Sequence, residues 1–307
     1  MRTQSFRHCR VPDRSIGLRI GGCTIALATE SDVLVTLPPP MRRFRTPVPE
    51  RPDVQITARR TSLSSWSPRG QLRFDSGEVW KLYANTAHVW IALYSRAFGH
   101  THPYQVACMD PEWHTGEVWL DTDAFPAHRP VYPLAYPLDE LILLHWLAQG
   151  RGCVLHAAAV CHPDGGILVF AGPSGAGKTT VSRLWHAHIG TSVLSDDRVI
   201  LRPEGSGVRA YGTPWHGEGR WVSSESGILR AILILEHGPQ ERLTPLHRAQ
   251  AVAECVTRSF FVPWNPEAVA HHTEIIDTIL ARVPCYRWTF RPVSDSVLWI
   301  TRTLAQR

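Results

Sequence analysis

The sequence predicts an α/β protein in two parts. A strand-rich α+β domain is expected over residues 1–135, and a domain in which apolar strands alternate with helices over residues 136–307. The length supports two domains, because 307 residues is about twice the size of an average one. The first part supplies short apolar runs separated by turn residues, whereas the second holds a glycine-rich turn between an apolar run and a helical run.

The composition is that of a soluble globular protein, with 44% apolar and 19% charged residues. The formal net charge of +5 is small and dispersed, so it gives no argument for nucleic-acid binding. The amino terminus has charge but no apolar core, and no run of about 18 apolar residues occurs. We therefore expect a cytoplasmic protein that binds neither nucleic acid nor membrane, while homo-oligomer formation stays open.

Cysteine and histidine spacing argues against a structural metal. The seven cysteines are odd in number, scattered and never spaced as C-x-x-C, which favours reduced thiols. The 16 histidines include one adjacent pair, His271 and His272, and a zinc site needs several ligands that converge from close pairs. The basic residues are almost all arginine, so each of the two lysines, Lys81 and Lys178, is informative where it falls in a motif.

Short apolar or alternating runs fill the chain from about Ser15 to Cys108, such as TIALA, DVLVTL, DVQITARR, QLRFDS and AHVWIALY. Clusters of Pro, Gly, Ser and Asn separate them, a pattern typical of β-strands joined by turns. The segment from Leu37 to Pro52 is too rich in proline for a helix, and we expect an exposed extended loop there.

A helix is expected over residues 137–149. Pro137 suits the first helical turn, Asp139 and Glu140 suit the positive end of the helix dipole, and Gly150 suits the stop. The domain boundary therefore falls between Tyr132 and Gly152.

Three apolar runs in the second half predict buried strands of one sheet: CVLHAAAV, GILVFAG and GILRAILILE. Helices are expected over residues 246–257 and 266–281, where apolar residues recur at helical spacing. A closing strand and a last helix from about Ser294 complete the domain.

Residues 172–179, GPSGAGKT, satisfy the pattern G-x-x-x-x-G-K-[ST], with an apolar strand before them and an amphipathic helix after them. Such glycines let backbone N–H groups surround a di- or triphosphate, and the helix amino terminus adds positive charge. Lys178 is expected to reach the β and γ oxygens and the Thr179 hydroxyl to ligate Mg²⁺. A glycine-rich turn without a ligand is the alternative. The expected nucleotide-binding set is Gly172, Pro173, Ser174, Gly175, Ala176, Gly177, Lys178, Thr179 and Thr180.

Asp196 and Asp197 follow the loop after a further short apolar run. Adjacent side chains on a strand point to opposite faces, so one carboxylate would approach the loop while the other turns away, unless the strand has ended and both reach the site. A carboxylate beside a phosphate loop usually serves Mg²⁺, and a second can accept a proton from an attacking hydroxyl. An Asp-Asp turn or a helix cap is the alternative interpretation.

Other polar residues near this stretch allow two interpretations each. His156, in the run VLHAAAV, is either functional or a satisfied core histidine. The segment over residues 210–219, AYGTPWHGEG, could present His216 and Glu218 to a ligand or be a tight surface loop. Some of the nearby arginines could contact phosphate or simply be solvated: Arg202, Arg209, Arg220 and Arg230.

Taken in order, LHAAAV, GPSGAGKTT, LSDDRVIL and YGTPWHGE resemble the HPr kinase/phosphorylase C-terminal domain family. The sequence is most similar to its stand-alone relatives, the HPr kinase-related proteins that include kinases of lasso-peptide precursors. The similarity spans about Tyr136 to Val297, and the ordered set is far more specific than the phosphate loop alone.

The resemblance implies a nucleotide domain with the fold that HPr kinases share with PEP carboxykinases. It also implies an ATP site with Mg²⁺ held by Thr179 and Asp196, and catalytic roles for Lys178, His156, Asp196 and Asp197. By the resemblance, one aspartate lies near Mg²⁺ and the other deprotonates the acceptor serine. We assign the base to Asp197, although the division between the neighbours could be reversed.

The sequence also departs from this family. Thr180 stands where HPr kinases carry a Glu after the loop hydroxyl, the region after GTPW does not resemble the segment linked to phosphorylase activity, and the first 130 residues do not resemble the HPr kinase amino-terminal domain. The reverse phosphorylase reaction is therefore not expected.

The leading hypothesis is an ATP-dependent, Mg²⁺-requiring serine or threonine kinase whose acceptor is a peptide or small protein. Asp197 would remove the hydroxyl proton, and an arginine such as Arg220 or Arg230 would steady the transferred phosphoryl group, with His216 and Glu218 as further substrate contacts. The strand-rich domain would recognise the substrate. A small-molecule or carboxykinase-like enzyme and a non-catalytic nucleotide sensor remain as alternatives, and the acceptor cannot be identified from the sequence.

Overall fold

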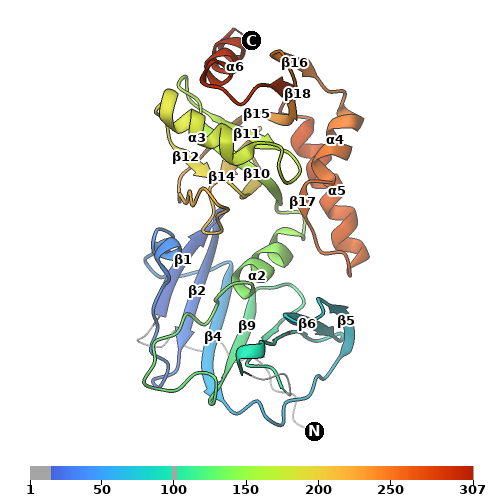
Figure 1. Cartoon of the computed structure of the whole chain (residues 1–307). Coiled ribbons are helices and arrows are strands. Elements are labelled where there is room, and N and C mark those ends of the chain that lie inside the picture. The colour runs from blue at the N-terminus through green and yellow to red at the C-terminus, as the bar shows by residue number, and fades with distance from the viewer. Residues whose placement is uncertain (1–14, 99–101, 307) are drawn as a thin grey trace. The chain divides into compact units, whose positions relative to one another are not determined.

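The protein is a mixed α/β structure with two nine-stranded sheets, in a computed structural model that describes residues 15–98 and 102–306 (Figure 1). Contacts between Cα atoms divide the chain into two compact units. The first unit runs up to Arg19 and includes Cys23–Pro38 and Arg45–Leu141. The second contains Ile20–Gly22, Pro39–Phe44 and Ile142–Arg307. Over the described ranges, no helix combines the length and the hydropathy that a membrane span requires.

The first unit is built on a sheet in which β2–β4 and β4–β9 are parallel pairs and the ladder from β9 to β5 is antiparallel. The strands lie in the order β3-β1-β2-β4-β9-β8-β7-β6-β5. Their bounds are β1 Ser15–Ile20, β2 Cys23–Thr29, β3 Arg45–Thr46, β4 Val54–Thr61, β5 Gln71–Asp75, β6 Trp80–Ala84, β7 Val89–Leu93, β8 Gln105–Met109 and β9 Thr115–Asp121, with a 3₁₀ turn at Arg96–Phe98.

Two local predictions in this half are wrong. The proline-rich segment is not simply an exposed extended loop, because it forms the short helix α1 (Pro39–Arg42) and buries the side chains of Met41 and Phe44. Proline fits a first helical turn, and two large apolar side chains anchor the segment by burial. The run DVLVTL is not a strand either: Val35 makes a single isolated bridge, to Val131.

The second unit is built on a sheet that closes on itself, because β11 pairs with β10 on one side and, in parallel, with β15 on the other. The order is β11-β10-β13-β14-β15-β18-β16, and β12 and β17 also pair with β10. The strands are β10 Cys153–Cys161, β11 Ile167–Ala171, β12 Val193–Ser195, β13 Arg198–Glu204, β14 Gly207–Tyr211, β15 Ser226–His237, β16 Arg242–Pro245, β17 Ser259–Phe260 and β18 Cys285–Phe290.

Helices cover the second sheet from two sides (Figure 1). One apolar cluster joins the strands to α4 and α5 through residues such as Cys255 and Ile276. The other cluster joins them to α3 and α6 through Trp185 and Ile300. The helices are α2 Leu138–Leu147, α3 Lys178–His188, α4 Arg248–Val256, α5 Pro266–Leu280 and α6 Ser294–Ala305.

The predicted helices of this half are confirmed to within two residues at each end. The residues at the start of two of them explain why the helices begin there. Pro137 directly precedes α2, and its carbonyl accepts the N–H of Leu141 (2.9 Å). Pro266 begins α5, and the side chain of Asn265 caps it by accepting the N–H groups of Glu267 and Ala268.

Candidate functional site

The glycine-rich loop joins the buried strand β11 to α3, as the motif requires. Gly177 lies at the amino end of α3 with φ 94°, and a Cβ there would come within 2.9 Å of Phe290, so only glycine fits. A Cβ on Gly172 would lie 2.6 Å from that of Ala176. The loop can therefore turn tightly into a helix whose first N–H groups have no partner within the helix, which is the geometry that binds anions.

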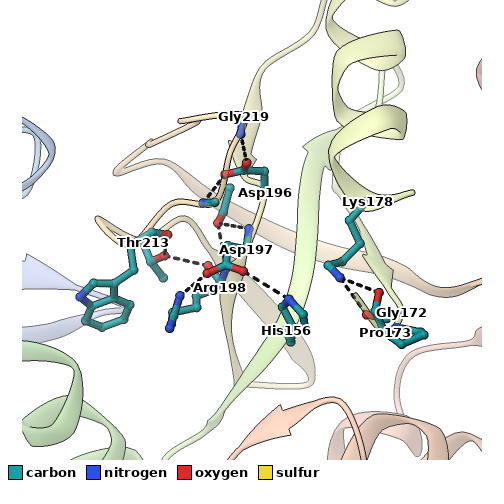
Figure 2. A network of polar contacts seen from close by, with 12 residues as sticks. His156, Gly172, Pro173, Lys178, Asp196, Asp197, Arg198, Thr213 and Gly219 are labelled. Atoms are coloured by element: carbon teal, nitrogen blue, oxygen red, sulfur yellow. Dashed lines mark hydrogen bonds and ion pairs between the residues drawn. The ribbon is translucent and has the colours of Figure 1, made fainter. Parts of the chain in front are cut away.

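Lys178 is the first residue of α3, and its side chain folds back over the loop. Its ammonium group donates hydrogen bonds to the carbonyl oxygens of Gly172 (2.9 Å) and Pro173 (3.0 Å) (Figure 2). Burial lowers the pKa of Lys178, Asp197 opposes this shift, and the charge of Arg258 adds to it. The lysine is thus held by two neutral carbonyls that a phosphate oxygen can replace.

Thr179 and Thr180 follow Lys178 on the first turn of α3, and both are partly buried. The hydroxyl of Thr179 makes no hydrogen bond in the described part of the chain. It is therefore free to act as an oxygen ligand. Ser174 and Gly175 lie at the exposed tip of the loop.

Asp196 and Asp197 occupy the break between β12 and β13, which both pair with β10, with a register shift in the β12 ladder between Ala159 and Val160. Because successive side chains on a strand point to opposite faces, the two carboxylates diverge (Figure 2). Asp196 is 2% exposed and turns toward a neighbouring loop, whereas Asp197 turns toward His156.

Asp196 anchors the loop that follows β14. One carboxylate oxygen accepts the N–H of Gly217 (3.0 Å) and the other accepts the N–H of Gly219 (2.6 Å). Both oxygens are therefore engaged by backbone, and the role of Asp196 as a magnesium ligand stays a prediction. A buried carboxylate with two backbone donors is a structural anchor.

Asp197 lies between two basic side chains. Its Oδ1 is 3.3 Å from Nε2 of His156, and its Oδ2 is paired with the Arg198 guanidinium. The His156 hydrogen bond, followed by the charges of Arg198 and Lys178, lowers the pKa of Asp197 although burial acts the other way. The lowered pKa favours the ionised carboxylate, and 20% of the side chain is exposed and open to a ligand.

Phe260 forms an apolar wall beside this pair. The guanidinium of Arg198 lies 4.8 Å from the centre of the Phe260 ring, and the imidazole of His156 meets the same ring edge-on at 6.1 Å. The strand β17 brings Phe260 there by pairing with β10. Both side chains that hold Asp197 are therefore oriented by packing.

Arg258 is a candidate that the sequence interpretation missed. Its carbonyl accepts the N–H of His156 (2.7 Å), and its Nη1 donates to Glu254. Its Nε is buried and has no hydrogen-bond partner in the described structure. No motif marks this arginine, because the pairing of β17 with β10, which sets it beside His156, is not visible in the sequence. Arg198 was also missed, although it directly follows the aspartate pair in the sequence.

The loop over residues 212–219 is tied to the same sheet. Thr213 is fully buried, and its hydroxyl donates to the carbonyls of Arg198 (2.7 Å) and Trp215 (3.2 Å). His216 and Glu218 are exposed on this loop, and the His216 ring contacts the Gly217 carbonyl. The structure gives neither side chain a contact with the phosphate loop.

The two arginines proposed to contact phosphate lie in different places. Arg220 is exposed at the end of the 212–219 loop. Arg230 lies at the amino end of β15, where its neighbour Leu229 pairs with Ile167, the first residue of β11. Its guanidinium is bound there by His162 and by the carbonyl of Leu304. The phosphate loop follows the other end of β11, which corrects the prediction of Arg230 as a phosphate contact.

Magnesium ligation would fall to Thr179 and the nucleotide. Over the residues the structure describes, no three His, Cys, Asp or Glu side chains converge as a metal cluster. Magnesium in phosphoryl-transfer sites usually has one or two protein oxygens, with phosphate and water oxygens completing the shell. The free Thr179 hydroxyl fits that small protein contribution.

No family model matches the sequence, and no curated protein matches it. A solved structure, the Hpr(Ser) kinase/phosphatase from Coxiella burnetii, is similar over 50% of this chain and 88% of that chain. The sequence identity is 12% and the TM-score 0.30, values at which the similarity carries no argument about the chemistry of the site.

Proposed function

We propose that this chain is a kinase that uses Mg²⁺ and ATP to phosphorylate a serine or threonine hydroxyl of a peptide or small protein. The observation that carries the proposal is Asp197. Its ionised carboxylate is held by His156 and Arg198 and interacts electrostatically with Lys178 of the phosphate loop. A nucleotide-binding loop alone needs no such carboxylate, whereas transfer to a hydroxyl does.

The phosphate loop would hold the ATP phosphates with backbone N–H groups and with Lys178. The Lys178 ammonium is bound to the carbonyls of Gly172 and Pro173. A phosphate oxygen offers the ammonium group a charged acceptor instead, which adds the attraction of opposite charges to the hydrogen bond. Mg²⁺ bound with ATP, through Thr179, would neutralise part of the phosphate charge.

Asp197 would orient the acceptor hydroxyl and take its proton. The hydroxyl oxygen forms a bond to the γ-phosphorus, the bond from the γ-phosphorus to the β–γ bridging oxygen breaks, and ADP leaves with that electron pair. The low pKa of Asp197 keeps it ionised but makes it a weak base. Proton transfer would thus be late, which suits a loose transition state in which the nucleophile contributes little bond order.

Arg258 would stabilise charge on the transferred group. Its buried Nε lacks a partner, and its charge already acts on Lys178. A fixed positive charge of this kind stabilises developing negative charge without reorganisation at the moment of reaction.

The test is phosphoryl transfer itself. The full chain is incubated with Mg²⁺, γ-labelled ATP and an array of serine and threonine peptides, and label on peptide is measured for the wild type and for Asp197→Asn. Labelled peptide from the wild type, lost in Asp197→Asn, supports the proposal. Tight ATP binding with no labelled peptide, identical in both proteins, sinks it and favours a nucleotide sensor.

A further inference from the structure

A hollow of about 610 Å³ lies along the 212–219 loop that Asp196 anchors. One wall is the end of this loop and the residues after it, and another is the carboxyl end of α3 with the segment leading into β12. The segment Pro39–Phe44, which belongs to the same compact unit, closes a third side. The residues on which the argument depends are Arg43, His186, Val193, His216, Arg220 and Trp221.

The hollow is lined by basic groups, and its two arginines have no ion-pair partner in the described part of the chain. Arg43 and Arg220 are both exposed, and neither guanidinium takes part in an ion pair within residues 15–98 and 102–306. His186 and His216 add two imidazoles, whereas Glu225 is the single carboxylate of the lining. Long arginine side chains left without carboxylates around a concave surface favour an anionic ligand.

Arg220 is held in an unfavourable backbone conformation. Its φ is 58°, in the left-handed region that non-glycine residues seldom adopt, and its N–H is bound to the carbonyl of Gly217 (3.2 Å). Strain of this kind persists where the surrounding structure imposes it, and it often marks a functional position. Here the anchored loop holds a charged side chain at the edge of the hollow.

ATP phosphates would bind elsewhere. Lys178 begins α3, and His186 lies eight positions later, so the two ends are about 12 Å apart along the helix axis. The hollow therefore lies about two helical turns beyond the phosphate loop, and its arginines are free to bind another molecule.

The hollow is connected to Asp197 through β12. Val193 lines the hollow, and Asp197 follows it by four residues, which span at most about 14 Å of extended chain. β12 itself is buried, so the peptide would cross this distance over the surface beside it. Four extended residues cover about 14 Å, so a peptide with its hydroxyl at Asp197 would place residues three to four positions from the hydroxyl in the hollow.

We propose that this hollow binds an acidic segment of the acceptor, with Glu or Asp three to four residues from the phosphorylated hydroxyl. The proposal rests on the kinase function proposed above, and it names the substrate class that the site takes. Arg43 and Arg220 bind the carboxylates, and Trp221, which packs beside His186 with ring centres 6.3 Å apart, gives the peptide an apolar surface.

Direct binding tests this assignment without any need for catalysis. The full chain is titrated into a fluorescein-labelled twelve-residue peptide with one serine and Glu three and four positions to either side of it, and anisotropy is measured. The control peptide carries Gln at the same positions. We expect the Glu peptide to bind about tenfold more tightly, with Arg43→Gln and Arg220→Gln each reducing its affinity about threefold.

Arg302→Gln is the matched control, because Arg302 is an exposed arginine on α6 outside the hollow. It should leave the affinity for the Glu peptide unchanged. Equal affinities for the Glu and Gln peptides, or the same loss in Arg302→Gln as in Arg220→Gln, overturn the assignment. The wild-type preference should also weaken as salt is raised, since these charges are exposed.

Lys178→Ala separates the two proposals, because it removes the phosphate-loop lysine and leaves the hollow intact. If Lys178→Ala still binds the Glu peptide more tightly than the Gln peptide, this supports the assignment of the hollow even if no peptide is ever phosphorylated. Phosphorylation of the Glu and Gln peptides with equal KM would support the proposed kinase function and overturn the proposal that the hollow binds acidic residues.

Discussion

Asp196 and Asp197 are neighbours in the chain, yet their carboxylates serve different parts of the structure. Asp196 binds the backbone N–H groups of Gly217 and Gly219, whereas Asp197 is paired with His156 and Arg198. Asp196 therefore holds the 212–219 loop in place, and Asp197 is available to a substrate.

The same Asp→Asn change should mainly reduce stability at position 196 and mainly reduce activity at position 197. Asp196→Asn replaces one acceptor oxygen by an NH₂ group, leaves a backbone N–H without a partner, and should lower the free energy of unfolding by about 2 kcal/mol. Asp197→Asn should cost less than about 1 kcal/mol, because its partners are partly exposed, while it abolishes phosphoryl transfer. Urea unfolding and peptide phosphorylation measure the two effects. Equal stability losses would contradict the division of roles.

Lys178 should be the lysine that nucleotide protects. The chain has one other lysine, Lys81, which is paired with Asp75 (2.9 Å) in the first sheet. An acyl-phosphate derivative of ATP should therefore acylate Lys178 far more than Lys81, and excess ATP should suppress only the former. Peptide mapping by mass spectrometry reads both sites. Equal labelling, or labelling of Lys178 that ATP leaves unchanged, would contradict nucleotide binding at the loop.

Arg258→Gln should lower kcat by about 10²-fold while KM for ATP changes little, because the proposed contact strengthens in the transition state. Glu254 keeps a partner in this variant, since Arg287 also bonds to it (2.6 Å). Arg287→Gln is the matched control: it removes an arginine from the same carboxylate and should leave kcat unchanged. A comparable loss of kcat in both variants would assign Arg258 to structure alone.

His272 should make stability depend on pH. It is buried, its Nε2 is 2.6 Å from the Ser259 hydroxyl, and burial lowers its pKa to about 4 from an ordinary value of 6.5. The unfolded chain therefore binds a proton first as pH falls, so the stability contributed by the neutral histidine is present above pH 6.5 and is lost progressively toward pH 4. At pH 5.5 the loss should be about 1 kcal/mol.

The check is the urea midpoint at pH 7.5 and pH 5.5 for the wild type, His272→Phe and His271→Gln. The difference between the two pH values should shrink in His272→Phe and persist in His271→Gln, which changes the adjacent histidine on α5. An unchanged difference in His272→Phe would show that other groups dominate this range.

Arg220→Gly should reveal what the left-handed backbone costs. Glycine adopts φ near 58° without strain, so the free energy of unfolding should stay the same or rise by up to about 1 kcal/mol. The melting temperature should follow it. Affinity for the acidic peptide should fall as in Arg220→Gln. A clear loss of stability would instead show that the arginine side chain supports the loop.

Local signals accounted for much of the second unit. The proline and asparagine at the start of α5 and the glycines of the phosphate loop specify their structure through φ, missing N–H groups and capping. The segment from Leu37 to Pro52 shows the limit of such signals, because its proline content predicted an exposed loop. The structure has a short helix there, and the segment buries the side chains of Met41 and Phe44.

By itself, the sequence determined the glycine-rich loop between β11 and α3 and the position of the aspartate pair, because both depend on residues that are adjacent in the chain. Only the tertiary structure decided which aspartate faces the site, since that depends on the register of β12 and β13 against β10. It also excluded Arg230, by placing it at the far end of β15, and brought in Arg258, by pairing β17 with β10. Pairing between distant strands is set by packing of the whole sheet, so no local stretch of sequence specifies it.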